Sequence, residues 1–384
     1  MTLINAQLVL PDTIQRGSLS VRSGRIAQIY RMQRTAGDAL DLRGGYLAPG
    51  FIDLHIHGAV GRDSMEASAD AFRAITEFHL RGGTTSIALT TVTAPEEEIL
   101  RVLEAAKPLQ NQSLGGARLI GIHIEGPFIS KEKPGAQNPK HVRPPDEAEW
   151  KKYLRFSPLV TEMTLAAEIP GALPLIIALR KNGAIASGGH TNATEDDLRP
   201  ALAAGLNHST HTFNAMSTAT RRGPYRVAGM LEFALAHREI SCELIADGVH
   251  VTPTLMRMLF NAKGRDGVCL ITDATGGAGL PPGTAFQVGG VAARVTADAA
   301  LTADGSALAG STLIMIEAVR RAVQLGGAPL VEAVRMASLN PARQLRRDHE
   351  LGSIEKGKRA DLVWFDREFR VRGVWLDGDL RFLA

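Results

Sequence analysis

The sequence predicts an α/β protein: a TIM-like (β/α)8 barrel joined to a small β-sandwich domain that both chain termini build. Eight short and almost continuously apolar runs alternate with helical patterns between residues 51 and 273. Such runs are typical of parallel strands whose two sheet faces are both covered. Polar side chains of metal-binding type follow five of these runs. An open doubly wound sheet is the alternative, but it would not bring five strand ends to one point.

The first 49 residues show strand patterns and turns, with no clear helix. A loosely alternating run at 3–10 is the clearest of these strands. A segment this short makes a marginal core alone. The tail at 352–365 is strand-like again, so we expect it to complete the same unit. The predicted division is 1–49 with 345–384 for the small domain and 50–344 for the barrel.

The expected barrel strands are 51–57, 85–91, 118–124, 162–167, 184–189, 206–212, 241–247 and 268–273. Helical patterns separate most of them, at 69–81, 95–106, 170–182, 195–204 and 253–263. Thr194 followed by three acidic residues is a typical helix start. After the last strand we expect a glycine-rich stretch at 276–290, a long loop at 297–310, and helices at 312–324 and 330–338.

Composition excludes several classes of protein. The formal net charge is +3, from 43 basic and 40 acidic residues without a long block of either sign, so neither nucleic acid nor an anionic membrane is an expected partner. Cys242 and Cys269 lie inside apolar runs, which favours a reducing compartment. No apolar run of about 18 residues and no leader pattern is present. We therefore expect a cytoplasmic protein.

The candidate chemistry lies at the ends of the predicted strands. His55 and His57 are two residues apart, so they share one face of the first strand. Glu125, His190, His211 and Asp273 each end a further run. Four imidazoles and two carboxylates suit zinc or another borderline divalent ion. Six donors exceed what one catalytic ion needs and are sufficient for two ions that share a bridging carboxylate.

Each of these residues has an ordinary alternative role when taken alone. His190 could be a loop histidine bonded to backbone, and Glu125 could cap a turn. His123, His208 and Asp53 are interpreted as structural residues. His123 shares a strand face with Glu125, so its alternative role is to support a metal ligand. The combined pattern, rather than any single member, carries the metal-site prediction.

Several motifs resemble a known family. The segment 49–58, PGFIDLHIHG, is similar to the first-strand signature of the amidohydrolase superfamily. Others resemble the N-acetylglucosamine-6-phosphate deacetylase family within it, in the right order between about residues 45 and 365: HIEGPF at 123–128, GHT at 189–191, HTFNAM at 211–216, IADGVH at 245–250, TDA at 272–274, LAGS at 308–311 and the tail at 352–361.

The resemblance implies roles for the metal-binding positions. Glu125, His190 and His211 would be the core ligands, and Asp273 would be the general base beside the metal. His55 and His57 match family members that hold a second ion, whereas other members lack the pair. The expected cofactor is therefore one or two divalent ions per subunit, with zinc preferred and iron, manganese or cobalt as alternatives.

The resemblance also implies substrate contacts. Asn214, Ala215 and His250 would contact the sugar, and Leu308 would lie in a loop over the site. Arg222 would meet the phosphate from a neighbouring subunit, which implies a homodimer or, as the alternative, a homotetramer. The remaining implied contacts come from the loop after the glutamate motif, at Ala136 and Gln137.

Gln137 is a departure from the family pattern. Members commonly carry histidine at this place, in a Gly-Ala-His-Asn-Pro-like segment, whereas this chain reads GAQNP at 135–139. Glutamine still donates a hydrogen bond to a hydroxyl or carbonyl, but it cannot become cationic. The identity of the sugar is therefore left open at this point.

The expected activity is metal-dependent hydrolysis of N-acetylglucosamine 6-phosphate to glucosamine 6-phosphate and acetate, in amino-sugar catabolism. The alternatives are deacetylation of N-acetylgalactosamine 6-phosphate or hydrolysis of another small amide. A cyclic imide or dipeptide hydrolase is disfavoured by Glu125, which stands where many amidohydrolases use a carboxylated lysine. A non-catalytic scaffold would be expected to lose metal ligands, and every ligand position is filled.

Overall fold

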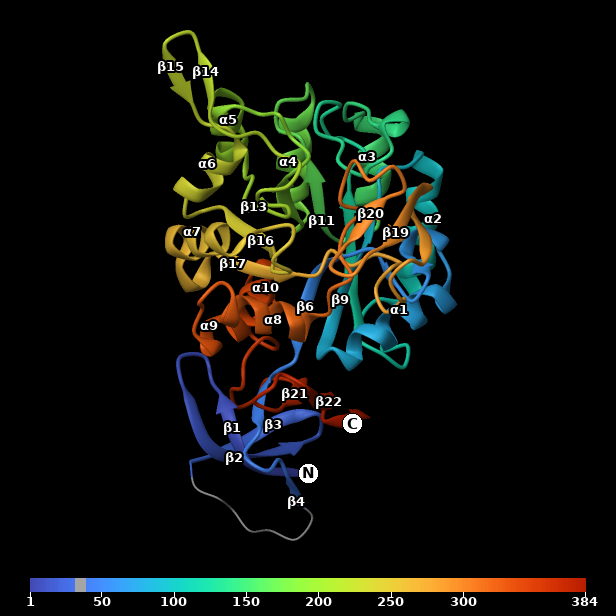
Figure 1. Cartoon of the computed structure of the whole chain (residues 1–384). Coiled ribbons are helices and arrows are strands. Elements are labelled where there is room, and N and C mark those ends of the chain that lie inside the picture. The colour runs from blue at the N-terminus through green and yellow to red at the C-terminus, as the bar shows by residue number, and fades with distance from the viewer. Residues whose placement is uncertain (32–38) are drawn as a thin grey trace.

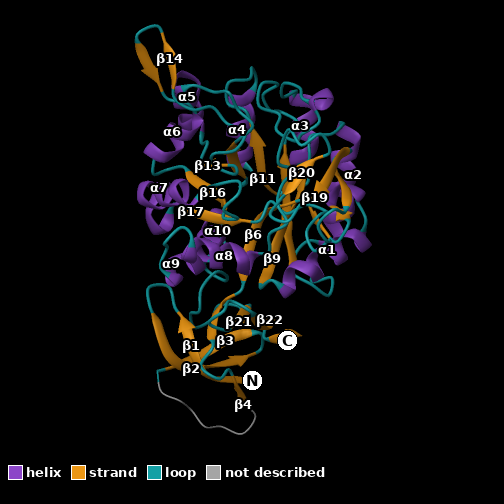
Figure 2. Cartoon of the chain, in the orientation of Figure 1, coloured by secondary structure: helices purple, strands orange, loops and turns teal. Residues whose placement is uncertain are grey.

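A computed structural model describes residues 1–31 and 39–384. Its larger part is a barrel of strands surrounded by helices, and both chain ends lie in a separate sheet below it (Figure 1). Among the described residues, helices are confined to the barrel part, and the lower sheet consists of strands and loops (Figure 2). The fold class predicted from the sequence is confirmed.

The barrel sheet has eight strands in the order β17-β16-β13-β12-β11-β10-β9-β6, and all neighbours are parallel. All eight predicted strands are present, and only their ends differ. Their bounds are β6 (Phe51–Ile56), β9 (Thr84–Thr91), β10 (Arg118–Glu125), β11 (Val160–Leu165), β12 (Ile185–Gly188), β13 (His208–Ser209), β16 (Ser241–Ile245) and β17 (Val268–Ile271).

The barrel closes between its first and last strands. Asp273 N donates to His55 O at 2.9 Å, and Ile56 and Ala274 form a parallel bridge. The Asp53 carboxylate adds a side-chain tie, because it accepts from Thr272 N at 3.2 Å and from Thr272 Oγ1 at 2.6 Å. Burial raises the pKa of Asp53 to about 7 despite these hydrogen bonds. Closure therefore places the end of β6 directly beside the end of β17.

Helices follow most strands and cover the outside of the barrel. The seven predicted helices are confirmed as α1 (Ala69–Arg81), α2 (Glu96–Ala106), α4 (Ala172–Lys181), α5 (Glu195–Ala204), α7 (Pro253–Lys263), α8 (Met315–Gln324) and α9 (Leu330–Met336). Three short helices were not predicted: α3 (Glu147–Leu154), α6 (Met230–Ala236) and α10 (Leu339–Gln344). Single 3-10 turns lie at Ser64–Glu66, Lys107–Leu109, Pro139–His141 and Gly264–Asp266. Within the described ranges, no helix combines the length and apolar character needed to span a membrane.

Small strand pairs interrupt the strand–helix alternation. The loop predicted at 297–310 is wrong in part, since it contains β20 (Ala300–Thr302), which pairs with β19 (Val291–Val295) and through it with β18 (Ala285–Val288). Ala293, Ala300 and Ala309 pack together as the small core of this inserted sheet. Two hairpins complete the set, β7 (Gly58–Ala59) with β8 (Arg62–Asp63) and β14 (Thr220–Arg222) with β15 (Tyr225–Val227).

The terminal sheet joins the two chain ends. Its order is β23-β22-β21-β5-β1-β2-β3, with β4 also paired to β1. The strands are β1 (Thr2–Val9), β2 (Ile14–Arg22), β3 (Arg25–Tyr30), β4 (Ala39–Asp41), β5 (Tyr46–Pro49), β21 (Leu362–Phe365), β22 (Val371–Leu376) and β23 (Asp379–Leu383). The expected strand at 352–365 is shorter than predicted, because only its last four residues are extended. We keep 1–49 with 345–384 as the proposed small domain.

A buried ion-pair cluster ties the terminal sheet to the barrel. Arg118, the first residue of β10, is 1% exposed. Its guanidinium donates from Nη1 to Asp361 Oδ2 and from Nη2 to Asp377 Oδ2, both at 2.7 Å. Charge-assisted bonds of this kind are strong and directional. The contact fixes the end of the polypeptide against the base of the third barrel strand.

The buried His79 of α1 predicts an acid-sensitive contribution to stability. Burial lowers its pKa to about 4, although a 3.4 Å contact from Nε2 to Gly58 O opposes the shift. Between pH 6.5 and 4 the unfolded chain therefore binds the proton and the folded chain does not, so stability is lost as the pH falls. Such a shift corresponds to about 3 kcal/mol.

Urea unfolding at a series of pH values tests this contribution. His79→Leu should flatten the fall in unfolding free energy between pH 6.5 and 4, relative to the unmodified protein. His349→Leu, at an exposed position in the segment after α10, is the control and should leave the slope unchanged. Equal slopes for all three proteins would contradict the assignment.

Candidate active site

A cavity of about 210 Å³ lies at the carboxyl ends of the barrel strands. Eleven of the thirteen predicted site residues line it: His57, Glu125, Ala136, Gln137, His190, His211, Asn214, Ala215, His250, Asp273 and Leu308. Of the other two, His55 lies fully buried behind His57, and Arg222 lies elsewhere. Gly135, Thr275, Val288, Ala307 and Gly310 also line the cavity, so the inserted sheet and the loop after it form part of the wall.

Glu125, His190 and His211 form the first group of potential ligands. Glu125 Oε1 lies 3.1 Å from the Nε2 atoms of both histidines, and these two nitrogens are 3.0 Å apart. His190 Nδ1 donates to Lys133 O at 2.9 Å, so its Nε2 is left with a lone pair directed at the group. Acceptor atoms this close repel one another unless a cation lies between them. These three side chains therefore fit the ligand set of a divalent metal ion.

His55, His57 and Asp273 form a second group beside the first. The two Nε2 atoms are 3.3 Å apart, and Asp273 Oδ1 lies 3.5 Å from that of His55 and 3.3 Å from that of His57. His55 Nδ1 donates to Glu243 Oε2 at 3.0 Å, so its Nε2 also presents a lone pair. This group fits a second ion by the same argument.

Glu125 connects the two groups. Its Oε1 faces His190 and His211, whereas its Oε2 lies 3.3 Å from His57 Nε2. Gln137 Nε2 also donates to Oε2, and Gln137 Oε1 accepts from Thr93 N at 2.7 Å. A backbone N–H can only donate, which fixes the orientation of the amide. Gln137 thus holds the carboxylate that both groups share, and because it also lines the cavity, the substrate contact that the resemblance implies stays a prediction.

Three of the clustered residues have strained backbones. His190, His211 and Asp273 have φ values of 47°, 27° and 47°, in the left-handed region that non-glycine residues rarely adopt. Such conformations concentrate at functional sites, where the surrounding structure holds them. Here the strain turns each chain sharply at the end of its strand, which directs the side chain into the cavity.

The carboxylates make the cavity attractive to cations. Burial disfavours the charged form of His57, yet hydrogen bonds with Asp273 and Glu125 overcome burial and raise its pKa to about 9. Burial likewise opposes protonation of His55, but Glu243, Glu125 and Asp273 hold its pKa well above the ordinary value. In the absence of metal, protons therefore occupy positions that a divalent ion would take.

His250 lies on the cavity wall with its ring held from behind. Asp247 Oδ2 accepts from His250 Nδ1 at 2.6 Å, and Asp247 Oδ1 accepts from the backbone N–H groups of Val249 and His250 at 2.8 Å. Burial opposes a charge on His250, but Asp247 raises its pKa above the usual range. The ring can therefore donate a hydrogen bond from Nε2 to a group bound in the cavity.

Sequence reasoning missed the supporting residues Glu243 and Asp247. Glu243 lies in the middle of the predicted strand 241–247, where a charged residue in an apolar run was a signal. Asp247 stands in the IADGVH motif, three residues before the histidine that it holds. Neither residue is among the predicted site residues.

Arg222 lies outside this chain's own cavity. It is exposed at the end of β14, where its Nη1 donates to Asp196 Oδ2 at 2.6 Å. The hairpin of β14 and β15 projects away from the barrel at the top of the molecule (Figure 1). Within one chain, Arg222 therefore does not complete the cavity.

A closed parallel barrel with a histidine–carboxylate cluster at its carboxyl end defines a class of metal-binding hydrolases, and comparison with known proteins agrees. The model of the amidohydrolase family matches residues 46–381, and the chain belongs to that family. It is therefore a hydrolase whose cluster is able to hold a divalent metal ion.

The particular members to which the chain is similar are deacetylases of phosphorylated amino sugars. N-acetylglucosamine-6-phosphate deacetylase of Bacillus subtilis is 35% identical over 97% of this chain and 94% of its own length. N-acetylgalactosamine-6-phosphate deacetylase of Escherichia coli O157:H7 is 35% identical over 87% of each chain. The structure of a variant N-acetyl-D-glucosamine-6-phosphate deacetylase of Mycobacterium smegmatis, solved with N-acetyl-D-glucosamine-6-phosphate, has a TM-score of 0.92 and 33% identity, covering 99% of each chain.

Proposed function

We propose that the protein hydrolyses N-acetylglucosamine 6-phosphate to glucosamine 6-phosphate and acetate, using one or two divalent ions. The observation that carries the proposal is the position of Asp273, whose Oδ1 lies 3.3 Å from His57 Nε2 on the wall of the open cavity. A carboxylate so placed can exchange protons with a molecule bound beside the metal ligands. The similarity to amino-sugar-phosphate deacetylases supports the substrate class.

The ligand set supports zinc as the native metal, with iron, manganese or cobalt as alternatives. Glu125, His190 and His211 would hold one ion, and His55, His57 and Asp273 would complete a second position. A bound divalent ion supplies Lewis acidity, which polarises the amide carbonyl and makes a water molecule easier to deprotonate.

The residues of the chain provide the proton transfers. Asp273 accepts a proton as the oxygen of water bonds to the amide carbon, and it returns that proton to the nitrogen as the carbon–nitrogen bond breaks. His250 donates a hydrogen bond to the oxygen that gains charge, or to a sugar hydroxyl. The products are acetate and the free amine sugar. Asn214, Ala215, Ala136 and Leu308 would enclose the sugar.

We place the reaction in the cytoplasm, because Cys242 and Cys269 are both buried free thiols. We propose a homodimer, or a homotetramer, in which Arg222 of one subunit reaches the cavity of another. Arg222 can reach a neighbouring subunit's cavity only if it lies outside the cavity of its own chain. Guanidinium suits a phosphate dianion through paired hydrogen bonds.

Acetate release from N-acetylglucosamine 6-phosphate tests the proposed function. The purified protein should release acetate, lose this activity after chelation, and regain it when zinc is restored. The same assay should include N-acetylgalactosamine 6-phosphate, because a relative acts on that sugar and Gln137 departs from the family pattern. No acetate from either sugar, with metal bound, would contradict the proposal. Faster turnover of the galactosamine compound would favour the second sugar.

Replacing Arg222 with Ala tests the phosphate contact. The variant should raise KM for N-acetylglucosamine 6-phosphate about 10- to 100-fold, since one charge-assisted pair is lost, and should change kcat/KM for unphosphorylated N-acetylglucosamine little. Arg226→Ala, on the partner strand of the same hairpin, is the control. Equal effects on both substrates would assign Arg222 a purely structural role.

A further inference from the structure

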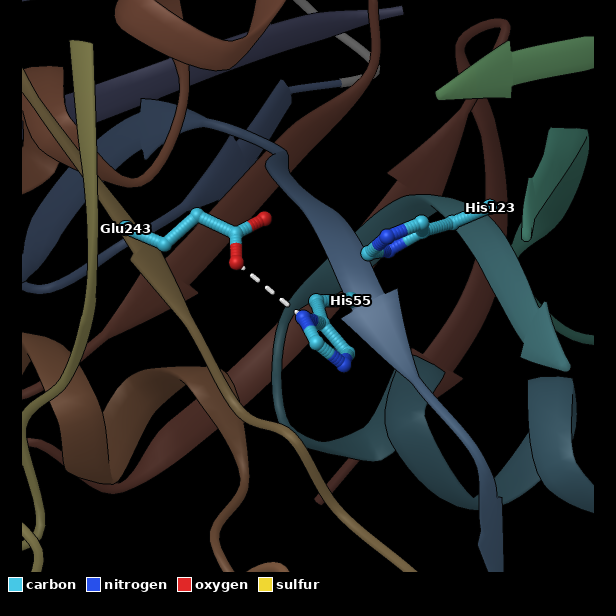
Figure 3. Close-up of side chains that lie close together, drawn as sticks. All are labelled: His55, His123 and Glu243. Atoms are coloured by element: carbon cyan, nitrogen blue, oxygen red, sulfur yellow. Dashed lines mark hydrogen bonds and ion pairs between the residues drawn. The ribbon is translucent and has the colours of Figure 1, made fainter. Parts of the chain in front are cut away.

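Glu243 of β16 lies inside the barrel beneath the cavity and is completely buried. Figure 3 shows its carboxylate directed at His55 of β6, with His123 of β10 on the other side of the imidazole. His55 Nδ1 donates to Glu243 Oε2 at 3.0 Å, and the rings of His55 and His123 meet edge to face with centroids 4.5 Å apart. The His55 ring is therefore held from both sides.

The same carboxylate oxygen also contacts the first group of potential ligands. His211 N donates to Glu243 Oε2 at 3.0 Å, and the backbone of Thr212 donates to Glu243 O at 3.0 Å. His211 follows β13, which pairs over only two residues, and its φ is 27°. Few ladder hydrogen bonds stabilise this strained turn, and the bonds to Glu243 add two further contacts that hold it.

One oxygen atom thus serves a residue of each group: the ring of His55 and the backbone of His211. The bond to Nδ1 also fixes the His55 tautomer, leaving the Nε2 lone pair directed toward Glu125 and Asp273. His57 differs, because its Nδ1 has no hydrogen-bond partner among the described residues. Glu243 is therefore a second side chain, besides Glu125, that links the two groups, and it does so from beneath the cavity.

We propose that Glu243 is a positioning residue that couples the two halves of the metal centre, so that its loss weakens binding of both ions. The inference rests on the proposed metal-dependent function and deepens it. Supporting partners of metal ligands commonly contribute about 10- to 100-fold in metal affinity. Here one such partner would act on ligands of two neighbouring ions, which predicts that both ions are affected by one substitution.

Two substitutions at this position separate reach from charge. Glu243→Gln keeps the length, and its side-chain oxygen can accept from both His55 Nδ1 and His211 N. Glu243→Asp keeps the charge, but it is one methylene shorter and cannot reach both donors. Zinc titration of the metal-free proteins, with metal analysis after gel filtration, should show near-normal binding for Gln. Glu243→Asp should weaken the binding of both ions about 10- to 100-fold.

Glu162→Gln and Glu162→Asp are the matched controls. Glu162 is also buried in the barrel, and it lies 4.0 Å from His123 and 4.0 Å from His208, neither of which belongs to the two groups of potential ligands that line the cavity. Both Glu162 variants should bind zinc normally. His55→Ala provides the reference for losing one ion only.

Several results would overturn the coupling. These are normal zinc binding by Glu243→Asp, a loss confined to one ion as in His55→Ala, equal losses in Glu162→Asp, or a loss in Glu243→Gln as large as in Glu243→Asp. Where Glu243→Asp does not fold, Glu243→Met takes its place, because it is of similar length but has no oxygen to accept from His55 Nδ1 and His211 N, and it should likewise weaken binding of both ions. Failure of the unmodified protein to bind zinc or any other divalent ion would instead contradict the proposed function, and the two failures are therefore distinguishable.

Discussion

Asp273→Asn should lower turnover of N-acetylglucosamine 6-phosphate about 100- to 10,000-fold while the metal content stays the same. The amide oxygen can still occupy the place of Oδ1, which lies 3.5 Å from His55 Nε2 and 3.3 Å from His57 Nε2. The amide cannot accept the proton that the attacking water gives up. The measurement is acetate release, with metal analysis of the same preparation.

Asp298→Asn serves as the control for Asp273→Asn, because Asp298 is an exposed carboxylate near the inserted sheet. The Asp298→Asn variant should be as active as the unmodified protein. Near-normal turnover by metal-loaded Asp273→Asn would exclude Asp273 as the general base, whereas lost metal would indicate that it is needed mainly as a ligand.

Glu125→Gln should have an effect of similar size through metal loss. The carboxylate presents Oε1 to His190 and His211 and Oε2 to His57, so it serves both groups of potential ligands. The amide keeps one acceptor oxygen and directs an N–H toward atoms that also need a cation. We expect acetate release to fall at least about 1,000-fold and zinc to be lost on gel filtration.

Glu132→Gln is the control for Glu125→Gln, because Glu132 lies in the following loop and is not part of the cavity wall. It should retain both metal and activity. A Glu125→Gln protein that keeps the normal metal content would show that the histidines alone hold the ions, and the bridging role of Glu125 would then be wrong.

Much of the barrel was predictable because each strand lies within a recognisable apolar run of the sequence, even where the paired part is as short as β13. Most of the site followed from this, since His190, His211 and Asp273 each come directly after such a run and parallel strands end at one edge. Two kinds of element escaped prediction. Helix α6 has only seven residues and a glycine at its N-cap, and the β18–β20 segment is rich in alanine and interrupted by Gly289-Gly290, which weakens its strand pattern.

Other features depend on contacts that no local pattern contains. The hydrogen bonds of Gln137 to Thr93 and Glu125 join three different segments of the chain. Those of Glu243 to His55 and His211 join strands that are far apart in sequence. The position of Arg222 on a projecting hairpin makes sense for a phosphate contact only if a second chain is present. These contacts and positions become visible only in the folded barrel.

The terminal sheet has a consequence for how the protein is made. β5 lies between β1 and β21, so one edge of the N-terminal strands is covered only by residues from 362 onward. At usual synthesis rates that partner emerges about 15 to 60 s after β5. Until then the newly made strands carry an open edge, which is a template for wrong pairing. The nascent chain is therefore exposed to aggregation for most of its synthesis, and a stop codon just before β21 would leave that edge open permanently.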